Sequence, residues 1–176
     1  MYVREYDGEN RPVKRTFYAD RTEANPEGKA TLVFGDYSVD AHGNVTEENG
    51  YTVDGSFYVR VTFRRGPAGQ TLEREEYFED DPRRNRSYRY RHNEHGHAIE
   101  ARTMDAAGTV LDVRLTQYRY DSEGRMIGWT AHDESGAPLG GARHQYNVDG
   151  DRIETLDLTA DGEAKRSRQF TYQFWE

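Results

Sequence analysis

The sequence predicts an all-β fold: an antiparallel meander of about 12 to 13 strands that forms a single curled sheet. Turn signals recur at nearly regular spacing, apolar and polar residues alternate between them, and no stretch carries the 3.6-residue apolar period of a helix. Aliphatic residues are scarce, while Tyr, Arg and Thr are plentiful. We therefore expect cross-strand side-chain pairs to support one long sheet, in place of the aliphatic core of a two-sheet sandwich.

The first turn class consists of an aromatic residue, Asp or Asn, two further residues, and then Gly or Asn. Copies without a gap begin at Tyr6, Tyr120 and Tyr146, and variants with two extra residues begin at Tyr37 and Tyr90. An Asp or Asn side chain at the first turn position accepts a hydrogen bond from the backbone two residues on. The closing Gly takes the left-handed conformation that completes a type I turn with a bulge. Each copy therefore predicts a tight hairpin.

A second turn class alternates with the first. Its copies span 25–28, 66–69, 105–108 and 133–136, with a degenerate copy at 159–162. From Gly96 onward, the closing glycines of both classes are separated by 12, 16, 12, 14 and 12 residues. Connections this short cannot carry parallel crossovers, so successive strands are expected to pair antiparallel.

The segments between the turns carry strand patterns. Residues 57–63 alternate, with apolar side chains on one face and Tyr, Arg and Thr on the other, and the aromatic residues of 170–174 alternate in the same way. Acidic residues fill much of 73–81, the chain turns at Pro82, and arginines fill much of 83–91. Folding back at Pro82 would set the acids against the arginines, and each such pair contributes a few tenths to about 1 kcal/mol.

Length and composition exclude several classes. The 176 residues suit one repeat-built β domain over 1–176, with weaker repeats in 1–87 and clearer repeats in 88–176. No apolar run approaches the roughly 20 residues needed to cross a bilayer, so no membrane span is expected. The N-terminus lacks the charged start and apolar core of a signal peptide, so the sequence predicts a cytoplasmic location if the chain is complete and otherwise leaves location open.

Cysteine usage and charge narrow the chemistry further. The chain has no Cys, which excludes disulfides, zinc–thiolate sites and cysteine nucleophiles. Its formal net charge of −8 argues against nucleic acid as a partner, because binding requires neutralised phosphates. The arginines of 83–91, interleaved with Tyr88 and Tyr90, could stack on single strands, but the adjacent acidic block favours internal pairing.

The turns also carry a family resemblance. The segment Tyr118–Arg125, followed by the turn at 133–136, resembles the YD repeat of RHS and teneurin-type proteins, and weaker copies trace back to Tyr6. In that family the repeats form a continuous β-sheet that spirals into a hollow shell, often around a toxin. The resemblance therefore implies a YD-repeat-like curled sheet or partial shell. The chain is much shorter than a whole shell and carries no plug or self-cleaving aspartyl-protease motif of the kind that ends such shells.

Exposed Tyr and Trp on a rigid sheet are suited to recognition, because rings give contact area at low entropic cost. The candidate binding residues are Trp129, Trp175, Tyr88, Tyr90, Tyr118, Tyr120 and Phe174, with Tyr58 near them in the predicted pattern. Rings of this kind could also stack on sugars, so a carbohydrate ligand stays open. An open meander leaves edge strands near 2–6 and 168–175, and the aromatic C-terminal edge predicts an edge-mediated contact with another chain.

The sharpest cluster for metal or enzyme chemistry is His92, His95 and His97, whose imidazoles could bind zinc or nickel. The alternative is structural, because 93–96 matches the repeat's turn and puts His95 at its tip. Recurring turn aspartates are explained by backbone hydrogen bonding, so no catalytic residue is assigned, and no cofactor is expected.

The sequence thus favours a non-enzymatic β-sheet module that binds or encloses a protein partner, either a toxin or neighbouring copies of the sheet. The resemblance implies a setting in bacterial toxin delivery. Two alternatives stay open: an immunity-type inhibitor whose acidic face blocks a basic toxin site, and a metal-dependent enzyme that uses the histidines of 92–97.

Overall fold

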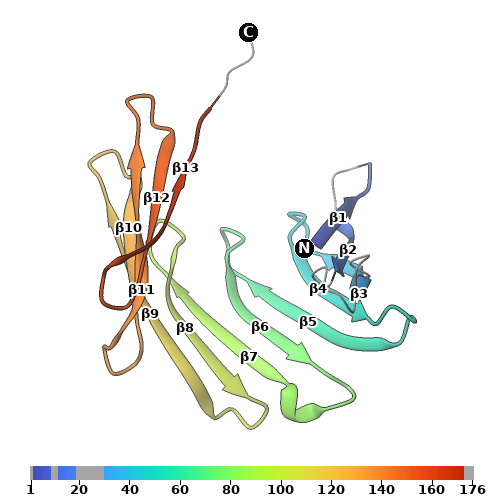
Figure 1. The fold of residues 1–176 in the computed structure, drawn as a ribbon. Coiled ribbons are helices and arrows are strands. Elements are labelled where there is room, and N and C mark those ends of the chain that lie inside the picture. Colours follow the sequence, from blue (N-terminus) through green and yellow to red (C-terminus); the bar gives the residue numbers. More distant parts are fainter. Residues whose placement is uncertain (1, 9–11, 19–29, 173–176) are drawn as a thin grey trace, which may run out of the picture. The chain divides into compact units, whose positions relative to one another are not determined.

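The computed structural model describes residues 2–8, 12–18 and 30–172, and within them 13 strands follow one another in sequence order in one sheet (Figure 1). The neighbouring pairs whose register is resolved are antiparallel. Apart from the short 3₁₀ helix η1 (Pro82–Arg84), the elements in these residues are all strands. The prediction of an all-β antiparallel meander is confirmed. The strands are β1 (Tyr2–Tyr6), β2 (Pro12–Tyr18), β3 (Ala30–Val39), β4 (Val45–Tyr51), β5 (Phe57–Arg65), β6 (Thr71–Tyr77), β7 (Arg86–His92), β8 (Ala98–Asp105), β9 (Val110–Tyr120), β10 (Met126–His132), β11 (Pro138–Tyr146), β12 (Arg152–Leu158) and β13 (Ala164–Gln169).

The chain divides into two compact units. Unit 1 comprises Met1–Tyr90 and Thr103–Leu111, and unit 2 comprises Arg91–Arg102 and Asp112–Glu176. Unit 1 therefore holds β1 to β6, most of β7 and the turn between β8 and β9. Unit 2 holds most of β8 and β9 together with β10 to β13.

One turn geometry recurs in both units, and the turn at Asp121 illustrates it. The Gly124 N–H donates to the Asp121 carbonyl at 3.1 Å, and the Asp121 N–H donates to the Arg125 carbonyl at 3.0 Å. The Asp121 carboxylate accepts from the N–H groups of Glu123 and Arg125. Gly124 has φ +78°, a left-handed conformation that costs other residues roughly 1–2 kcal/mol. These are the contacts of a type I turn with a bulge.

The same pair of backbone hydrogen bonds closes nine turns in the described residues, which confirms the predicted turn chemistry there. The closing glycines are Gly43, Gly55, Gly69, Gly96, Gly108, Gly124, Gly136, Gly150 and Gly162, all at positive φ. The turn predicted after Tyr6 and the turn at 25–28 fall on residues 9–11 and 19–29, outside the described part of the chain.

The core of unit 1 lies on one face of β3 to β5. Phe34, Val59 and Val61 are 7%, 3% and 2% exposed, and Phe17 packs edge-to-face on Phe34 with ring centroids 5.8 Å apart. Gly50 lies opposite both Phe34 and Val59 in register, and a Cβ added there would lie 2.8 Å from Val59 and 2.9 Å from the Phe34 ring. The missing side chain therefore makes room for the aromatic ring.

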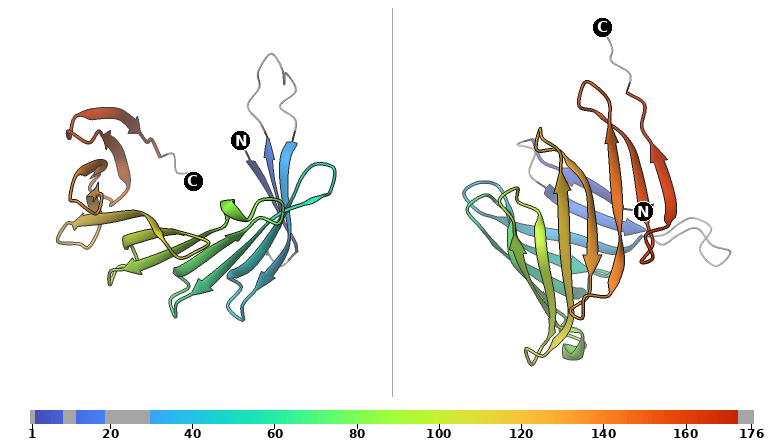
Figure 2. Two further views of the ribbon diagram at one scale, coloured as in Figure 1. Left: turned by 90° about the horizontal axis from the view of Figure 1, so that it is seen from below. Right: turned by 90° about the vertical axis from the view of Figure 1, so that its left-hand side faces the viewer.

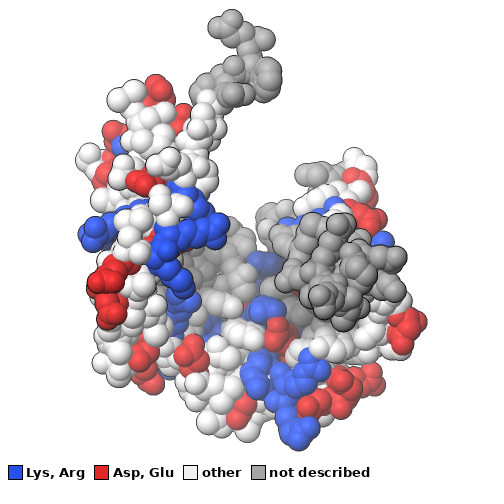
Figure 3. Space-filling view, viewed as in Figure 1, with Lys and Arg blue, Asp and Glu red and all other residues white. Residues whose placement is uncertain are grey.

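Unit 1 also contains the acid–arginine block on either side of η1. Glu73 lies opposite Arg89 in the β6–β7 register, and their charged groups are 3.7 Å apart. Asp81 caps η1 by accepting from the Arg83 N–H, and the Arg83 guanidinium lies 2.8 Å from the Asp81 carboxylate. Figure 3 shows acidic and basic side chains side by side around this turn. The predicted internal pairing is therefore present, although Arg74 pairs with Glu76 on its own strand.

Unit 2 is packed around small and polar residues. Ala131, Ala142 and Thr155 are 0%, 2% and 3% exposed. Long aliphatic side chains such as Leu139 stay at the surface, 49% exposed. The hairpins of β9 to β13 run side by side (Figure 2), held mainly by backbone pairing and by contacts between neighbouring side chains.

A tyrosine contact repeats through unit 2. Three hydroxyls each donate to a backbone carbonyl 20 residues earlier in the chain: Tyr118 to Ala98 (3.1 Å), Tyr146 to Met126 (2.9 Å) and Tyr172 to Arg152 (3.1 Å). Each acceptor is the first residue of the strand that follows a turn, namely β8, β10 or β12. Tyr118 and Tyr146 thus tie β9 and β11 to the start of the strand before each, and Tyr172, which follows the end of β13, contacts the start of β12 in the same way.

Candidate functional site

The strand register of unit 2 brings two predicted binding residues together in a row that crosses five strands. Tyr118 lies opposite Trp129, and the next partners in the row are Ala142, Asp157 and Arg166. Directly opposed residues of an antiparallel pair share one face, with Cβ atoms about 4.5–5.5 Å apart. The row therefore presents an aromatic end on β9 and β10 and a charged end on β12 and β13.

A hollow of about 350 Å³ lies along this row between Trp129 and Arg166. The side chain that separates Trp129 from Asp157 is only the methyl group of Ala142, which leaves the indole half-buried. The Arg114 guanidinium lies 5.9 Å from the Trp129 ring. The hollow is lined by Trp129, Leu139, Gly140, Gly141, Asp157, Leu158, Lys165 and Arg166.

The strand β13 lies beside this hollow and ends the strand order of the described residues. All six of its residues are exposed, and three of them, Lys165, Arg166 and Arg168, are basic. Arg168 pairs with Asp157 at 2.9 Å. Figure 3 shows Lys and Arg side chains gathered in the region of this strand.

The second aromatic cluster of unit 2 joins β9 to the turn at 93–96. The His95 ring stacks on Tyr120 with centroids 4.1 Å apart, and the His97 ring stacks on Tyr118 at 4.9 Å. The Asn93 amide donates to the Tyr120 hydroxyl oxygen at 2.9 Å, and the same hydroxyl is hydrogen-bonded to His97 Nδ1 at 2.6 Å.

The histidines thus serve the turn and the aromatic stack. His92 lies at the end of β7, His95 at the exposed turn tip and His97 in the stack. Within the described residues, no group of three His, Cys, Asp or Glu side chains lies close enough to hold a metal ion. The stacked rings favour the structural explanation of the 92–97 cluster.

The remaining candidate residues lie elsewhere. Tyr88 and Tyr90 belong to unit 1, where the Tyr88 hydroxyl donates to Glu76 at 3.0 Å and the Arg74 guanidinium lies 5.0 Å from the Tyr88 ring. Tyr58 packs on Phe78 beneath the Arg84 guanidinium, also in unit 1. Trp175 and Phe174 lie outside the described residues.

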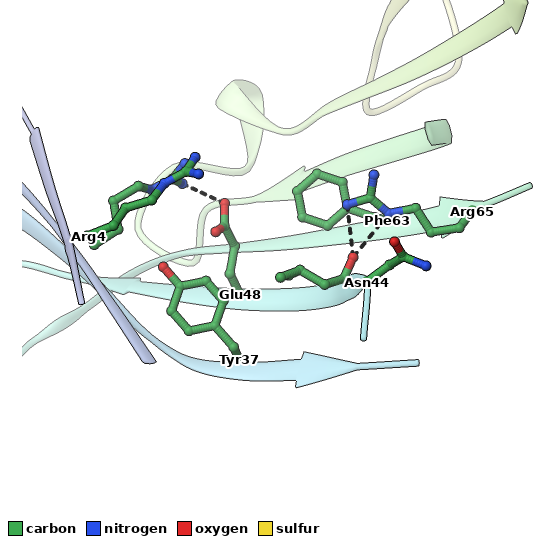
Figure 4. Close-up of a pocket in the computed structure, with 8 residues that line it drawn as sticks. Arg4, Tyr37, Asn44, Glu48, Phe63 and Arg65 are labelled. Atoms are coloured by element: carbon green, nitrogen blue, oxygen red, sulfur yellow. Dashed lines mark hydrogen bonds and ion pairs between the residues drawn. The ribbon is translucent and has the colours of Figure 1, made fainter. Parts of the chain in front are cut away.

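Unit 1 contains a cavity of about 370 Å³ that the sequence reasoning missed (Figure 4). Arg15 of β2 and Glu48 of β4 form an ion pair at 2.6 Å, with side chains only 20% and 9% exposed. Removing one partner of such a buried pair typically costs about 3–5 kcal/mol, because a charge is left uncompensated. The cavity is lined by Arg4, Arg15, Tyr37, Asn44, Val45, Glu48, Phe63 and Arg65.

This cavity is lined by arginines, although the chain as a whole is acidic. Burial, together with the nearby Glu48 carboxylate, raises the pKa of the Tyr37 phenol, so Tyr37 stays protonated over a wide pH range. One signal in the sequence could have indicated the site. Glu48 is two residues from Gly50 and therefore shares its face, and a carboxylate at an inward strand position requires a cationic partner.

The chain was compared with known proteins. No protein-family model and no curated protein sequence matches it. Among solved structures, the crystal structure of TcdB2-TccC3-TEV is similar at 17% identity and a TM-score of 0.36, over 98% of this chain and 11% of that chain. The crystal structure of TcdB2-TccC3-Cdc42 is similar at 16% identity and a TM-score of 0.36, over 97% and 11%. A porin-like protein from Bacteroides uniformis is similar at 12% identity and a TM-score of 0.41, over 89% and 52%.

This chain spans only about a tenth of the length of the two TcdB2-TccC3 chains. At these identities and TM-scores, the likeness extends no further than the general β-sheet fold. In the part of the chain that the structure describes, no helix is long and apolar enough to span a membrane.

Proposed function

We propose that this chain is a non-enzymatic, repeat-built β-sheet module that binds a protein partner along the outer edge of β13. The observation that carries the proposal is the combination of a fully exposed basic edge strand with an aromatic hollow beside it. Proteins that bind an extended segment by adding a strand use the same two parts: backbone hydrogen bonds give affinity, and side-chain pockets give specificity.

The backbone of β13 has donors and acceptors available for such a partner. The Phe170 N–H donates to the Ile153 carbonyl at 3.0 Å, so these two residues form a hydrogen-bonded pair. From this position along the β12–β13 ladder, non-hydrogen-bonded and hydrogen-bonded pairs alternate. In that alternation, Ser167 and Gln169 direct their N–H and C=O groups away from β12. Unpaired backbone groups at a sheet edge are a template for pairing with another chain, and the charged side chains of β13 restrict which chain can pair there.

Charge and shape indicate the partner's chemistry. The three basic residues of β13 favour an acidic strand, and the half-buried Trp129 ring with the exposed Leu139 offers an apolar surface for one of its side chains. The resemblance of the turns to YD repeats supports a toxin-associated setting, in which the partner is a toxin or another copy of the sheet.

Ser167→Pro tests the proposal directly. Proline removes an N–H that faces outward and leaves the β12 ladder intact, and proline is tolerated on edge strands in this orientation. Ser167→Ala is the matched control, because it also loses the Ser167 hydroxyl contact with Glu154 but keeps the N–H. The measurement is quantitative capture of proteins from the source lysate by four immobilised full-length baits: wild type, Ser167→Pro, Ser167→Ala and Trp129→Ala.

We expect a partner that wild type and Ser167→Ala capture equally and that Ser167→Pro and Trp129→Ala lose. Light scattering on the same proteins distinguishes pairing between copies of this chain from capture of another protein. Equal capture by Ser167→Pro and Ser167→Ala, with both variants folded by circular dichroism, would contradict an edge-mediated contact.

A further inference from the structure

The cavity of unit 1 is assembled by an irregularity in β3. From Gly35 to Ser38 the chain advances three residues while its partner β4 advances two, from Asn49 to Glu47, so one residue is extra. Asp36 sits in this bulge at φ +50°, and its carboxylate accepts a hydrogen bond from the Tyr51 hydroxyl. Bulges re-aim the side chains that follow them.

The bulge reverses the face on which the next residue lies. Without the extra residue, Tyr37 would lie on the face opposite Phe34, since the two positions are three apart. With it, Tyr37 packs against the Phe34 cluster and lines the cavity together with Glu48 (Figure 4). Within the described residues, no hydrogen bond from the Tyr37 hydroxyl is found.

Arg15 brings a second unsatisfied donor. Its guanidinium is held 4.6 Å from the centroid of the Phe34 ring and donates through Nη2 to Glu48. Its Nε is buried and has no hydrogen-bond partner. Buried donors are rarely left unpaired, so an orphaned N–H beside a cavity points to an absent acceptor.

Arg65 supplies positive charge on the other side of the cavity. Its guanidinium donates to the Val45 carbonyl through Nε (3.1 Å) and Nη2 (2.9 Å) and to the Thr71 hydroxyl through Nη1 (2.6 Å). All three contacts are with neutral oxygens, so they leave the charge of Arg65 uncancelled. Glu48, the single carboxylate among the described lining residues, pairs with Arg15 and therefore does not compensate Arg65.

We propose that this cavity binds a small oxyanion, a carboxylate or a phosphate, through Arg15, Tyr37 and Arg65. An anionic oxygen would accept from the Arg15 Nε–H and the Tyr37 hydroxyl and would balance the charge of Arg65. Guanidinium forks match the planar oxygens of carboxylates and also bind phosphates. The volume falls within the range of roughly 300–1,000 Å³ that small-molecule sites occupy. The site lies wholly in unit 1 and is independent of the edge contact proposed for β13.

Isothermal titration of the full chain with succinate, and separately with inorganic phosphate, tests the site and distinguishes the two sources of the oxyanion. Succinamide has the same skeleton as succinate without the charge, and sodium chloride at matched ionic strength controls for screening. Saturable binding of at least one anion, with none of succinamide, is expected. A weak site has a dissociation constant of roughly 1 mM. If neither anion showed saturable binding at concentrations up to about a hundredfold that value, the proposal would be overturned.

Three variants assign the binding to these residues. Tyr37→Phe removes one hydroxyl and keeps the ring, and Arg65→Gln removes one charge from the cavity. Arg64→Gln is the matched control, because Arg64 is exposed and paired with Glu73 outside the cavity. Because a hydrogen bond to a charged group is a strong one, we expect Tyr37→Phe and Arg65→Gln each to lose about tenfold or more in affinity. The control Arg64→Gln should change the affinity by less than about twofold. Equal affinities in all three folded variants would overturn the assignment.

Discussion

Units 1 and 2 share one turn geometry and differ in what lies between the turns. Unit 1 buries large side chains, with Phe34 and its neighbours on β5 forming a conventional core. Unit 2 buries mostly small or polar residues, with Val113 and His144 among them, and ties its strands with tyrosine hydroxyls that bond to carbonyls 20 residues earlier. A sheet with few aliphatic residues can therefore be held in two ways, by a local aromatic core or by a repeated polar contact.

The difference has a functional consequence. In unit 1 the larger cavity lies where a bulge and a buried ion pair interrupt the packing of large side chains, at Tyr37 and at the Arg15–Glu48 pair. In unit 2 the hollow beside Trp129 is lined in part by Gly140 and Gly141, which have no side chains, and the contact proposed there lies at the sheet edge. Each candidate site therefore lies at a place where the side chains of its own unit leave a hollow.

The largest effect is expected from removing the centre of the unit 1 core. Phe34→Ala deletes a 7%-exposed ring, its edge-to-face contact with Phe17 and the surface that supports Arg15, so the free energy of unfolding should fall by about 3–5 kcal/mol. Urea unfolding measures the loss. Hydrogen exchange should show it as faster exchange in β3 to β5.

Phe57→Ala is the control for this prediction, because Phe57 is 36% exposed and has one edge-to-face contact, with Tyr51. We expect a loss of about 1 kcal/mol. If Phe34→Ala accelerated exchange equally in β10 to β12, the two units would unfold together. The difference in how their cores are packed would then not correspond to a difference in their stabilities.

A feature could be predicted from the sequence when the residues that form it lie close together along the chain. The turns depend on residues within five positions of one another, so Asp121 and Gly124 reveal their turn without any knowledge of the fold. The alternation at 57–63 likewise predicts the inward Val59 and Val61, while Phe57, at the start of the strand, is more exposed than the pattern suggests. Trp129 could be chosen as an anchor by residue type alone.

The candidate sites depend on register, which the sequence does not reveal in the same way. The hollow beside Trp129 is lined by residues of β10 to β13, which strand pairing brings side by side. The cavity of unit 1 needs side chains from separate strands and one extra residue at Asp36, which moves Tyr37 to the face of Glu48. No motif connects these positions, because their contact is created by pairing between strands.

The tyrosine contacts of unit 2 are expected to have an intermediate effect. Tyr146→Phe keeps the ring beneath the Arg125 guanidinium, 5.1 Å away, and removes the hydrogen bond to the Met126 carbonyl. A typical net value for one such bond is about 1 kcal/mol, which urea unfolding can resolve. The control is Tyr77→Phe in unit 1, whose ring is 42% exposed and whose substitution should change stability by less than about 0.5 kcal/mol. Equal losses from both would mean that the repeated contact does not stabilise unit 2.

The smallest effect concerns pH and a buried histidine of unit 2. His144 is 9% exposed, its Nδ1 lies 3.0 Å from the Thr155 hydroxyl, and its buried Nε2 has no hydrogen-bond partner. Burial, and then the positive charges of Arg152 and Arg168, lower the pKa of His144, against a weaker opposing effect of Asp157. The folded state therefore binds fewer protons than the unfolded state as the solution becomes acidic.

A lowered pKa fixes the sign of the pH dependence. The contribution of a neutral His144 to stability is complete above the ordinary histidine pKa of about 6.5 and is lost as pH falls through the lower folded value. Urea midpoints measured from pH 7.5 to pH 5.5 should therefore decrease in the wild type and decrease less in His144→Gln, which cannot titrate. His42→Gln, at an exposed turn position, is the control for replacing a histidine elsewhere in the chain. If His144→Gln followed the wild-type curve, His144 would not be the source of the acid sensitivity between pH 7.5 and pH 5.5. The pKa values of Asp121 and Asp133 are lowered chiefly by side-chain hydrogen bonds from Arg125 and Ser135, so their contribution is lost only below the ordinary carboxyl range of about 4. The two sources therefore separate along the pH axis, and the difference between wild type and His144→Gln from pH 7.5 to pH 5.5 reports on His144.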